Sequence, residues 1–271
     1  MRIGIGAIAR GIRSRVAQGI QRRKVRSSIR PTDVFLVTYP KSGTIWLSYI
    51  LAHALKLGPP EELNLRSLVE YVPDVNEIYF THGSLHAYDA LSNPRLFCLH
   101  AAYDRAFPKV VYMLRDPRDV AVSYWHFRKL TERDFKLTLR QFVEEDRHWP
   151  CSWEKHVAGW LLNHQHPNLL LVKYEEMAQD PLAVLTRMVG FLGVQVGEAD
   201  LARAADASRF ANMQTLETKF GVAGPEVVGE GRIVRRGRVG GWKEELDETS
   251  LRILEDKCSP VMDKVGYRRV T

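Results

Sequence analysis

The chain has 271 residues, 45% of them hydrophobic, and this size and composition suit one enzyme domain with a substantial core. Its formal net charge is +7, but nine Lys or Arg residues and no acid fall in residues 1–30, so the rest of the chain carries −2. This distribution argues against a nucleic-acid-binding domain, in which the positive charge would spread over a folded face.

Residues 1–30 are predicted to form a basic arm before a domain of residues 31–271. Apolar side chains recur in the arm at helical spacing, at Ile5, Ile8, Ile12, Val16 and Ile20, although glycines weaken that helix. Two interpretations stay open: an interfacial helix drawn to a membrane surface or a partner, and a solvated tail or a helix packed on the domain. The sequence contains no run of about 20 apolar residues, so no membrane-spanning helix is predicted.

The rest of the chain alternates short apolar strands with helical patterns, which predicts an α/β fold: a parallel sheet with helices on both faces, in three layers. Strands are predicted at 34–38, 96–99, 109–114 and 169–173. Helices are predicted at 45–57, 117–130, 136–147, 153–164, 181–192, 198–206 and 244–257. Segment 211–233, rich in glycine, is predicted to be a mobile loop that closes over a ligand.

A first motif, residues 38–46, joins the first predicted strand to the first predicted helix. Backbone N–H groups and the helix dipole at such a junction favour an anion, and Lys41 adds a positive charge. Lys41 precedes Gly43, so the loop is not a Walker A motif. This segment alone allows two readings, a phosphate site of another kind and an ordinary strand-to-helix turn.

Two further motifs point to phosphate. Arg115 ends the strand at 109–114, and Ser123 lies about two turns into the helix that follows. Residues 234–243 place three arginines among glycines, a pattern that suits a flexible clamp because guanidinium groups bind phosphate oxygens bidentately. For each feature taken alone, the alternatives are that Arg115 pairs with Asp119 or another carboxylate, that Ser123 is a small packing residue, and that residues 234–243 are a solvated basic loop.

Together these runs resemble the cytosolic sulfotransferase family, which uses 3′-phosphoadenosine-5′-phosphosulfate (PAPS) and yields adenosine 3′,5′-bisphosphate (PAP). Two more segments, 152–160 and 170–181, resemble that family's motifs in the same order. The resemblance runs from about Asp33 to the C-terminus and implies a P-loop-like nucleotide-binding fold. Its departures are typical of a divergent or bacterial-type member.

The resemblance implies a role for each matching residue. His100 and Lys41 match catalytic positions. The implied cofactor contacts are Lys41, Ser42, Gly43, Thr44, Ile45 and Trp46 in the first loop, Arg115 and Ser123 at the 3′-phosphate, Tyr174, Ser208 and Phe210 around the adenine, and Arg235, Arg236 and Gly237 in the late loop. His156 is expected to be structural, packed in a helix with Trp153 and Trp160.

The chemistry agrees with these roles. Sulfuryl transfer resembles phosphoryl transfer, in which positioning and charge neutralisation do most of the catalysis. An acceptor hydroxyl needs a general base near neutral pH, a task that suits His100. The expected function is transfer of a sulfuryl group from PAPS to a hydroxyl, or secondarily an amine, of a small, partly apolar acceptor. The alternatives are a weak or inactive nucleotide-binding relative and a P-loop kinase-like enzyme.

Several positions depart from the family pattern. Ile45 replaces a Thr of the first loop, Cys98 replaces the Lys two residues before the catalytic His, and Gly241 replaces an Asp of the late loop. Residues 244–247 lack the dimer segment of animal members, so the oligomeric state stays open. Three cysteines without metal-ligand spacing indicate free thiols, a cytoplasmic location and no metal site.

Overall fold

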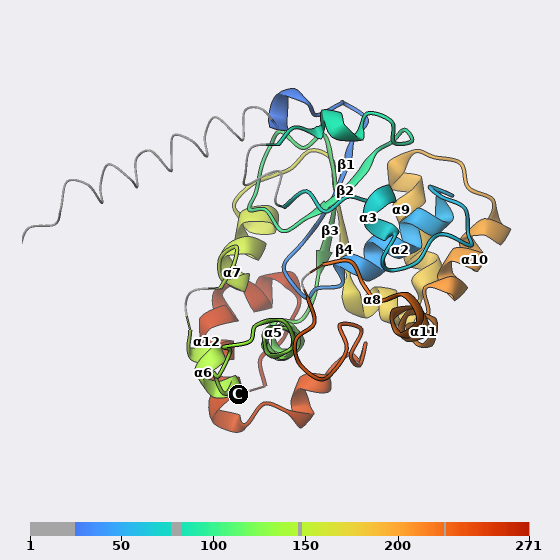
Figure 1. Ribbon diagram of the computed structural model, residues 1–271. Helices are drawn as coiled ribbons and strands as arrows, with labels where there is room; N and C mark the ends of the chain where they lie inside the picture. The colour runs from blue at the N-terminus through green and yellow to red at the C-terminus, as the bar shows by residue number, and fades with distance from the viewer. Residues whose placement is uncertain (1–24, 77–82, 146–147, 225, 271) are drawn as a thin grey trace, which may run out of the picture.

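The fold is built on one parallel sheet (Figure 1). The computed structural model describes residues 25–76, 83–145, 148–224 and 226–270. Its four strands pair in the order β2-β1-β3-β4, and all the pairs are parallel. The strands are β1 (Val34–Thr38), β2 (Leu96–Leu99), β3 (Lys109–Leu114) and β4 (Leu169–Lys173). All four match the predicted strands residue for residue, because short apolar runs buried on both faces are typical of parallel strands.

The two faces of the sheet pack into two separate cores, and strand periodicity decides which residue enters which core. Phe35 and Val37 of β1 face one core, while Val34 and Leu36 face the other. All four side chains are at most 1% exposed. Successive side chains of a strand point to opposite faces, so one apolar run supplies both cores.

Helices cover both faces and complete the three predicted layers (Figure 1). The core that contains Val34 is covered by α2 (Thr44–Ala54), α3 (Leu68–Tyr71), α8 (Tyr174–Gln179), α9 (Pro181–Leu192), α10 (Glu198–Ala207) and α11 (Phe210–Phe220). The core that contains Phe35 is covered by α5 (Pro117–Thr131), α6 (Leu139–Glu144), α7 (Trp153–Val157) and α12 (Glu248–Met262). Shorter turns lie at Leu85–Tyr88, Ala158–Leu162, Gly241–Glu244 and Asp263–Val265.

The helix predictions were less accurate than the strand predictions. The helix expected at 153–164 is α7 followed by a π-helical turn, and the last helix begins at Glu248 because the Asp247 side chain accepts a hydrogen bond from Ser250 N–H. The prediction of a mobile loop over 211–233 was wrong for its first half, where α11 forms. Sequence reasoning also missed α3 and α8.

Residues 25–30, predicted to belong to the arm, pack on the domain instead. Val25 is fully buried, Arg26 forms an ion pair with Asp104 at 2.9 Å, and the Ser28 hydroxyl accepts a hydrogen bond from Leu85 N–H. The apolar stripe of the arm lies outside the described residues. Within the described ranges no helix is long and apolar enough to cross a membrane.

A buried ion pair joins the starts of two strands. Arg95, just before β2, donates to both carboxylate oxygens of Asp33, just before β1, at 2.6 and 2.8 Å. Neither side chain is exposed. The guanidinium also donates to the carbonyls of Ser28 and Leu85, so one side chain ties residues 25–33 and the turn at 85–88 to the sheet.

Candidate active site

A cavity of about 450 Å³ opens at the carboxyl ends of the strands. The loop after β1, His100 after β2, Arg115 after β3 and Tyr174 after β4 all line it, which is the edge where open α/β sheets bind ligands. The cavity brings together His100, Lys41, Gly43, Thr44, Ile45, Trp46, Arg115, Ser123, Tyr174, Ser208, Phe210, Arg235, Arg236 and Gly237. Of the residues proposed from sequence, Ser42 alone does not line the cavity.

Ser42 and Gly43 show how tightly the first loop packs. Ser42 is fully buried, and its Oγ has no hydrogen-bond partner among the described residues, so its contribution to the loop is its backbone. Gly43 has φ of 110°, and a Cβ there would lie 2.8 Å from Met113 Sδ and 2.9 Å from Tyr174 Cδ2. Glycine is therefore required where the loop turns into α2.

Lys41 sits in a cationic and partly apolar environment. Its Nζ lies 4.1 Å from the centroid of the Phe127 ring. Burial, together with the positive charges of Arg115 and Arg235, lowers the pKa of Lys41 to about 8, although Glu217 opposes this shift. Three cations that disfavour one another at one end of a cavity make that end a suitable site for a multivalent anion.

His100 is held by the end of the neighbouring strand. Its Nδ1 lies 2.8 Å from the Thr38 carbonyl oxygen and 3.0 Å from Thr38 Oγ1, which is itself 2.6 Å from Thr44 Oγ1. A carbonyl accepts only, so Nδ1 carries the proton, and the lone pair is assigned to Nε2. Nε2 has no hydrogen-bond partner among the described residues. Burial lowers the pKa of His100, against the opposing effect of Asp74.

Arg115 bridges the first loop and the late loop. Its Nη1 donates to the Lys41 carbonyl at 3.0 Å, and its Nη2 lies 3.4 Å from the Arg238 carbonyl. Its guanidinium stacks 4.0 Å from the centroid of the Tyr174 ring. Nε is buried and has no hydrogen-bond partner within the described residues, so the guanidinium keeps a donor for a ligand. Ser123 lines the same cavity from α5.

The late loop is anchored by Asp119 on α5. The two oxygens of this carboxylate accept the N–H groups of Gly240 and Trp242 at 2.8 and 3.0 Å. Burial raises the pKa of Asp119, against those two hydrogen bonds and the charge of Arg115. The expected alternative of an Arg115–Asp119 hydrogen-bonded pair does not form, since Arg115 donates to backbone carbonyls.

Two arginines of the late loop, Arg235 and Arg236, pair with carboxylates of residues 244–245, just before α12. Arg235 Nη1 lies 2.8 Å from Glu245 Oε1, and Arg236 Nη1 lies 3.1 Å from Glu244 Oε2. The pair of His126 with Glu245 extends this network. The Arg236–Glu244 pair is about half-exposed and therefore weak, so a phosphate group can replace its carboxylate partner.

Helix α11, in the segment expected to be a loop, positions the clamp from the other side. Gln214 Nε2 donates to the Val234 and Arg235 carbonyls, both at 3.1 Å. Glu217 accepts the N–H groups of Ile233 and Val234 at 2.7 and 3.0 Å. The late loop is thus held by side chains of a helix and lacks the freedom that its glycines suggested.

Aromatic rings form the end of the cavity proposed to hold the adenine. The Trp46 and Tyr174 rings meet edge to face with centroids 5.2 Å apart. The Ser208 hydroxyl donates to the Ala205 carbonyl at 3.0 Å, and a Cβ on Gly237 would lie 2.1 Å from the Phe210 ring. The close approach of loop and ring explains why glycine, with φ of 57°, occupies this position.

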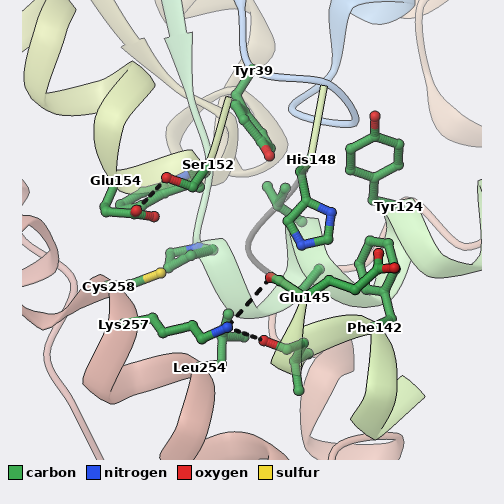
Figure 2. Close-up of a pocket in the computed structure, with 15 residues that line it drawn as sticks. Tyr39, Tyr124, Phe142, Glu145, His148, Ser152, Glu154, Leu254, Lys257 and Cys258 are labelled. Atoms are coloured by element: carbon green, nitrogen blue, oxygen red, sulfur yellow. Dashed lines mark hydrogen bonds between the residues drawn. The ribbon is translucent and has the colours of Figure 1, made fainter. Parts of the chain in front are cut away.

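A second, smaller cavity of about 130 Å³ is lined by side chains of α5, α6, α7 and α12 (Figure 2). Tyr124 lines both cavities. The Tyr39 hydroxyl donates to the Cys151 carbonyl at 3.0 Å, and the Tyr124 hydroxyl donates to the Trp149 carbonyl at 3.1 Å. These bonds fix the segment that places the Trp149 ring perpendicular to His100, with centroids 5.6 Å apart.

His156 is structural, as predicted. It is 1% exposed, and its ring bonds to the Tyr112 hydroxyl at 2.9 Å and to the Ala101 carbonyl at 3.0 Å. Trp153 and Trp160 are buried beside it. All three cysteines are free.

Sequence reasoning missed four polar residues that shape the site. Thr38 orients His100, and Asp119 anchors the late loop. Asn76 accepts the His100 N–H at 2.6 Å and also holds Asp74. Thr38 and Asp119 stand inside motifs that sequence reasoning had quoted, whereas Asp74 and Asn76 lie in a segment without usable periodicity.

Comparisons with known proteins agree with this geometry. Residues 31–266 match the family model of the sulfotransferase domain. Human Sulfotransferase 2B1 is 33% identical over 236 residues, which cover 80% of this chain and 62% of that protein, less than two thirds of its length. Human Sulfotransferase 4A1 is 31% identical over 228 residues, covering 80% of this chain and 75% of that protein.

A solved structure shows the same fold with a nucleotide bound. Mouse sulfotransferase SULT7A1, complexed with PAP, is 25% identical and superposes with a TM-score of 0.69 over 91% of this chain and 90% of its own. The chain belongs to the sulfotransferase family. The family and the α/β fold predicted from the motifs are therefore confirmed.

Proposed function

We propose that this protein transfers the sulfuryl group of PAPS to a hydroxyl of a small, partly apolar acceptor, with His100 as the general base. As a member of the sulfotransferase family it is a PAPS-dependent enzyme, in keeping with the PAP bound to its solved relative. The observation that carries the proposal is the hydrogen bond that His100 Nδ1 donates to the Thr38 carbonyl, where β1 ends and the first loop begins. This bond leaves the lone pair on Nε2 to accept a proton.

The proposed reaction uses few groups. His100 Nε2 takes the proton of the acceptor hydroxyl as its oxygen bonds to sulfur, and the bond between sulfur and the bridging oxygen of the 5′-phosphate breaks. Lys41 and Thr44 stabilise the charge that develops on the leaving phosphate. Arg115, Arg235 and Ser123 would bind the 3′-phosphate, which distinguishes this donor from ATP.

The residues present fit a donor with two anionic ends. Burial, with the charges of Arg115 and Arg235, lowers the pKa of Lys41, and a bound anion would favour its charged form again. The unpaired, buried Nε of Arg115 offers a further donor. These observations support binding of PAPS.

Calorimetric titration of PAP and adenosine 5′-monophosphate tests the donor assignment. We expect PAP to bind about 10- to 100-fold more tightly, and Arg115→Ala to abolish that difference, because charged hydrogen bonds to phosphate are lost. Arg140→Ala is the matched control, since Arg140 pairs with Glu144 on α6 and does not line the cavity. Equal affinity for the two nucleotides would overturn the assignment.

Turnover separates an enzyme from an inactive relative. Sulfated product from PAPS and para-ethylphenol, absent with His100→Ala, would support the proposed reaction. Tight PAP binding without any sulfated acceptor would favour the inactive, nucleotide-binding alternative. Phosphoryl transfer from ATP would instead favour a kinase-like enzyme.

We also propose that the basic stretch 1–24 makes peripheral contact with anionic membranes. Its positive charge, without an acid to balance it, supports attraction to such a surface. Co-sedimentation with phosphatidylserine vesicles should be lost on deletion of 1–24, with PAP affinity unchanged. Equal sedimentation of both proteins would contradict this role.

A further inference from the structure

The acceptor end of the cavity carries an exposed carboxylate, Asp74. Asp74 lines the cavity beside His100, on a segment that bridges to Cys98 at the outer edge of β2. None of the described Lys, Arg or His side chains forms an ion pair with it. The other acid that lines the cavity, Asp119, differs because it accepts two backbone N–H groups.

Asn76 fixes this carboxylate next to the proposed base. The Asn76 side chain donates to Asp74 Oδ1 at 2.5 Å, and its Oδ1 accepts the His100 N–H at 2.6 Å. The Asn76 N–H also donates to Asp74 Oδ1, at 2.9 Å. Both bonds use Oδ1, so Oδ2 keeps its acceptor capacity for a ligand.

The strand order separates the charges of the cavity. Lys41 and Arg115 follow β1 and β3, and the late-loop arginines gather on the same side, whereas Asp74 lies beyond β2 at the opposite edge. Cys98, next to Asp74, adds no charge because burial raises the pKa of its thiol well above neutral. The donor end is therefore cationic and the acceptor end anionic.

We infer that the acceptor carries a protonated amine beside the hydroxyl that is sulfated, and that Asp74 binds this ammonium group. The inference rests on the proposed sulfuryl transfer and names its acceptor class. The apolar wall of Leu68, Val69, Val72 and Trp149 would hold the carbon skeleton. Asp74 is exposed at the edge of the cavity, so an ammonium group of a bound acceptor can reach its free carboxylate oxygen.

Matched acceptors test the inference through a ratio. Tyramine and para-ethylphenol share a phenol and a two-carbon chain and differ in the amine. In the full-length wild type we expect kcat/KM for tyramine to exceed that for para-ethylphenol about tenfold or more. Asp74→Asn should lower this ratio about 10- to 100-fold, while Asp74→Glu keeps most of it.

Glu70→Gln is the control variant. Glu70 lies exposed on α3, close to Asp74 in sequence, and does not line the cavity, so its neutralisation changes the net charge equally without touching the acceptor. The tyramine preference should survive in this variant. Equal efficiency of the two acceptors in the wild type, or a preference that Asp74→Asn leaves intact, would overturn the inference.

A binding measurement keeps the test independent of turnover. Phenethylamine, which has the amine but no hydroxyl, should bind the wild-type complex with PAP and bind Asp74→Asn about tenfold more weakly. Equal binding to both proteins would overturn the inference even if no acceptor is sulfated. Sulfation of para-ethylphenol without any amine preference sinks this inference alone, whereas a protein that neither binds PAP nor sulfates an acceptor sinks the proposed function.

Discussion

Lys41 and His100 have their pKa values lowered by burial, and the two shifts serve opposite ends of the proposed reaction. For Lys41 burial and the neighbouring cations weaken the preference for the charged form, and a bound anion strengthens it. For His100 the neutral form, which a general base requires, is favoured over a wider pH range. The Thr38 carbonyl selects the tautomer of His100, so one strand end determines both loop geometry and base orientation.

The first prediction concerns pH and nucleotide affinity. The pKa of Lys41 is about 8 in the protein and should rise when PAP binds, so binding takes up a proton above that pH. PAP affinity should therefore fall as pH rises through 8, by at most about tenfold per pH unit. Calorimetry in buffers of different ionisation enthalpy measures the uptake. Lys41→Met should bind more weakly and lose this dependence; a pH profile unchanged by the substitution would contradict the assignment.

The second prediction concerns His100 and rate. Since burial lowers its pKa, the acid limb of kcat/KM should lie below the ordinary imidazole value of about 6.5. The limb shifts to lower pH because the neutral form of His100 is the active base, and a lowered pKa keeps His100 neutral at lower pH. His100→Gln should reduce kcat about 10²- to 10⁴-fold and remove the acid limb, with PAP still bound. An acid limb that persists in the variant would assign the base elsewhere.

At the scale of elements, side chains of α5 and α11 hold the late loop in place. Asp119 holds its Gly240–Trp242 end, while Gln214 and Glu217 hold its Ile233–Arg235 end. The arginines between these anchors face the cavity from a fixed frame. Flexibility inferred from glycine content was therefore overridden by side-chain hydrogen bonds from two helices.

The third prediction tests that frame. Asp119→Asn leaves one acceptor oxygen for the two backbone N–H groups of Gly240 and Trp242 and removes the charge, which should weaken loop docking by roughly 2 kcal/mol. Trypsin should then cleave faster after Arg236 and Arg238, and PAP affinity should fall. Asp206→Asn, an exposed substitution on α10, is the control and should leave cleavage unchanged. Wild-type cleavage kinetics in Asp119→Asn would show that the anchor is unnecessary.

At the scale of the whole molecule, the stabilising ion pair and the ligand-binding cavity lie at opposite ends of the sheet. The buried pair of Arg95 and Asp33 lies at the amino ends of β1 and β2, whereas the cavity lies at the carboxyl ends. Stability and ligand binding can therefore be altered independently. The two cores on either side of the sheet connect these ends.

The fourth prediction uses that separation. Arg95→Met leaves the Asp33 carboxylate buried without its cation, which should lower the free energy of unfolding by about 3–5 kcal/mol. Urea denaturation measures the loss, and PAP affinity of the folded fraction should be unchanged. Arg30→Met breaks the partly exposed pair with Asp89 and should cost less than about 1 kcal/mol. Similar losses in the two variants would contradict the role assigned to burial.

The sequence by itself determined the strands and the placement of the anion-binding groups. Apolar runs of four to six residues are typical of parallel strands buried on both faces, and the residues that follow each run then lie at the ligand-binding edge, as Lys41, His100 and Arg115 do. Local patterns suffice for such features because strand periodicity and the residue that ends a strand are adjacent in the chain.

Only the tertiary structure decided how those groups are oriented and what lies opposite them. The contacts of Thr38 with His100, Asp119 with Gly240 and Glu217 with Val234 join residues that are far apart in the chain. Asp74 entered the site because a segment without periodicity bridges to the edge of β2. Long-range hydrogen bonds depend on the packing of whole elements, which no local pattern of residues specifies.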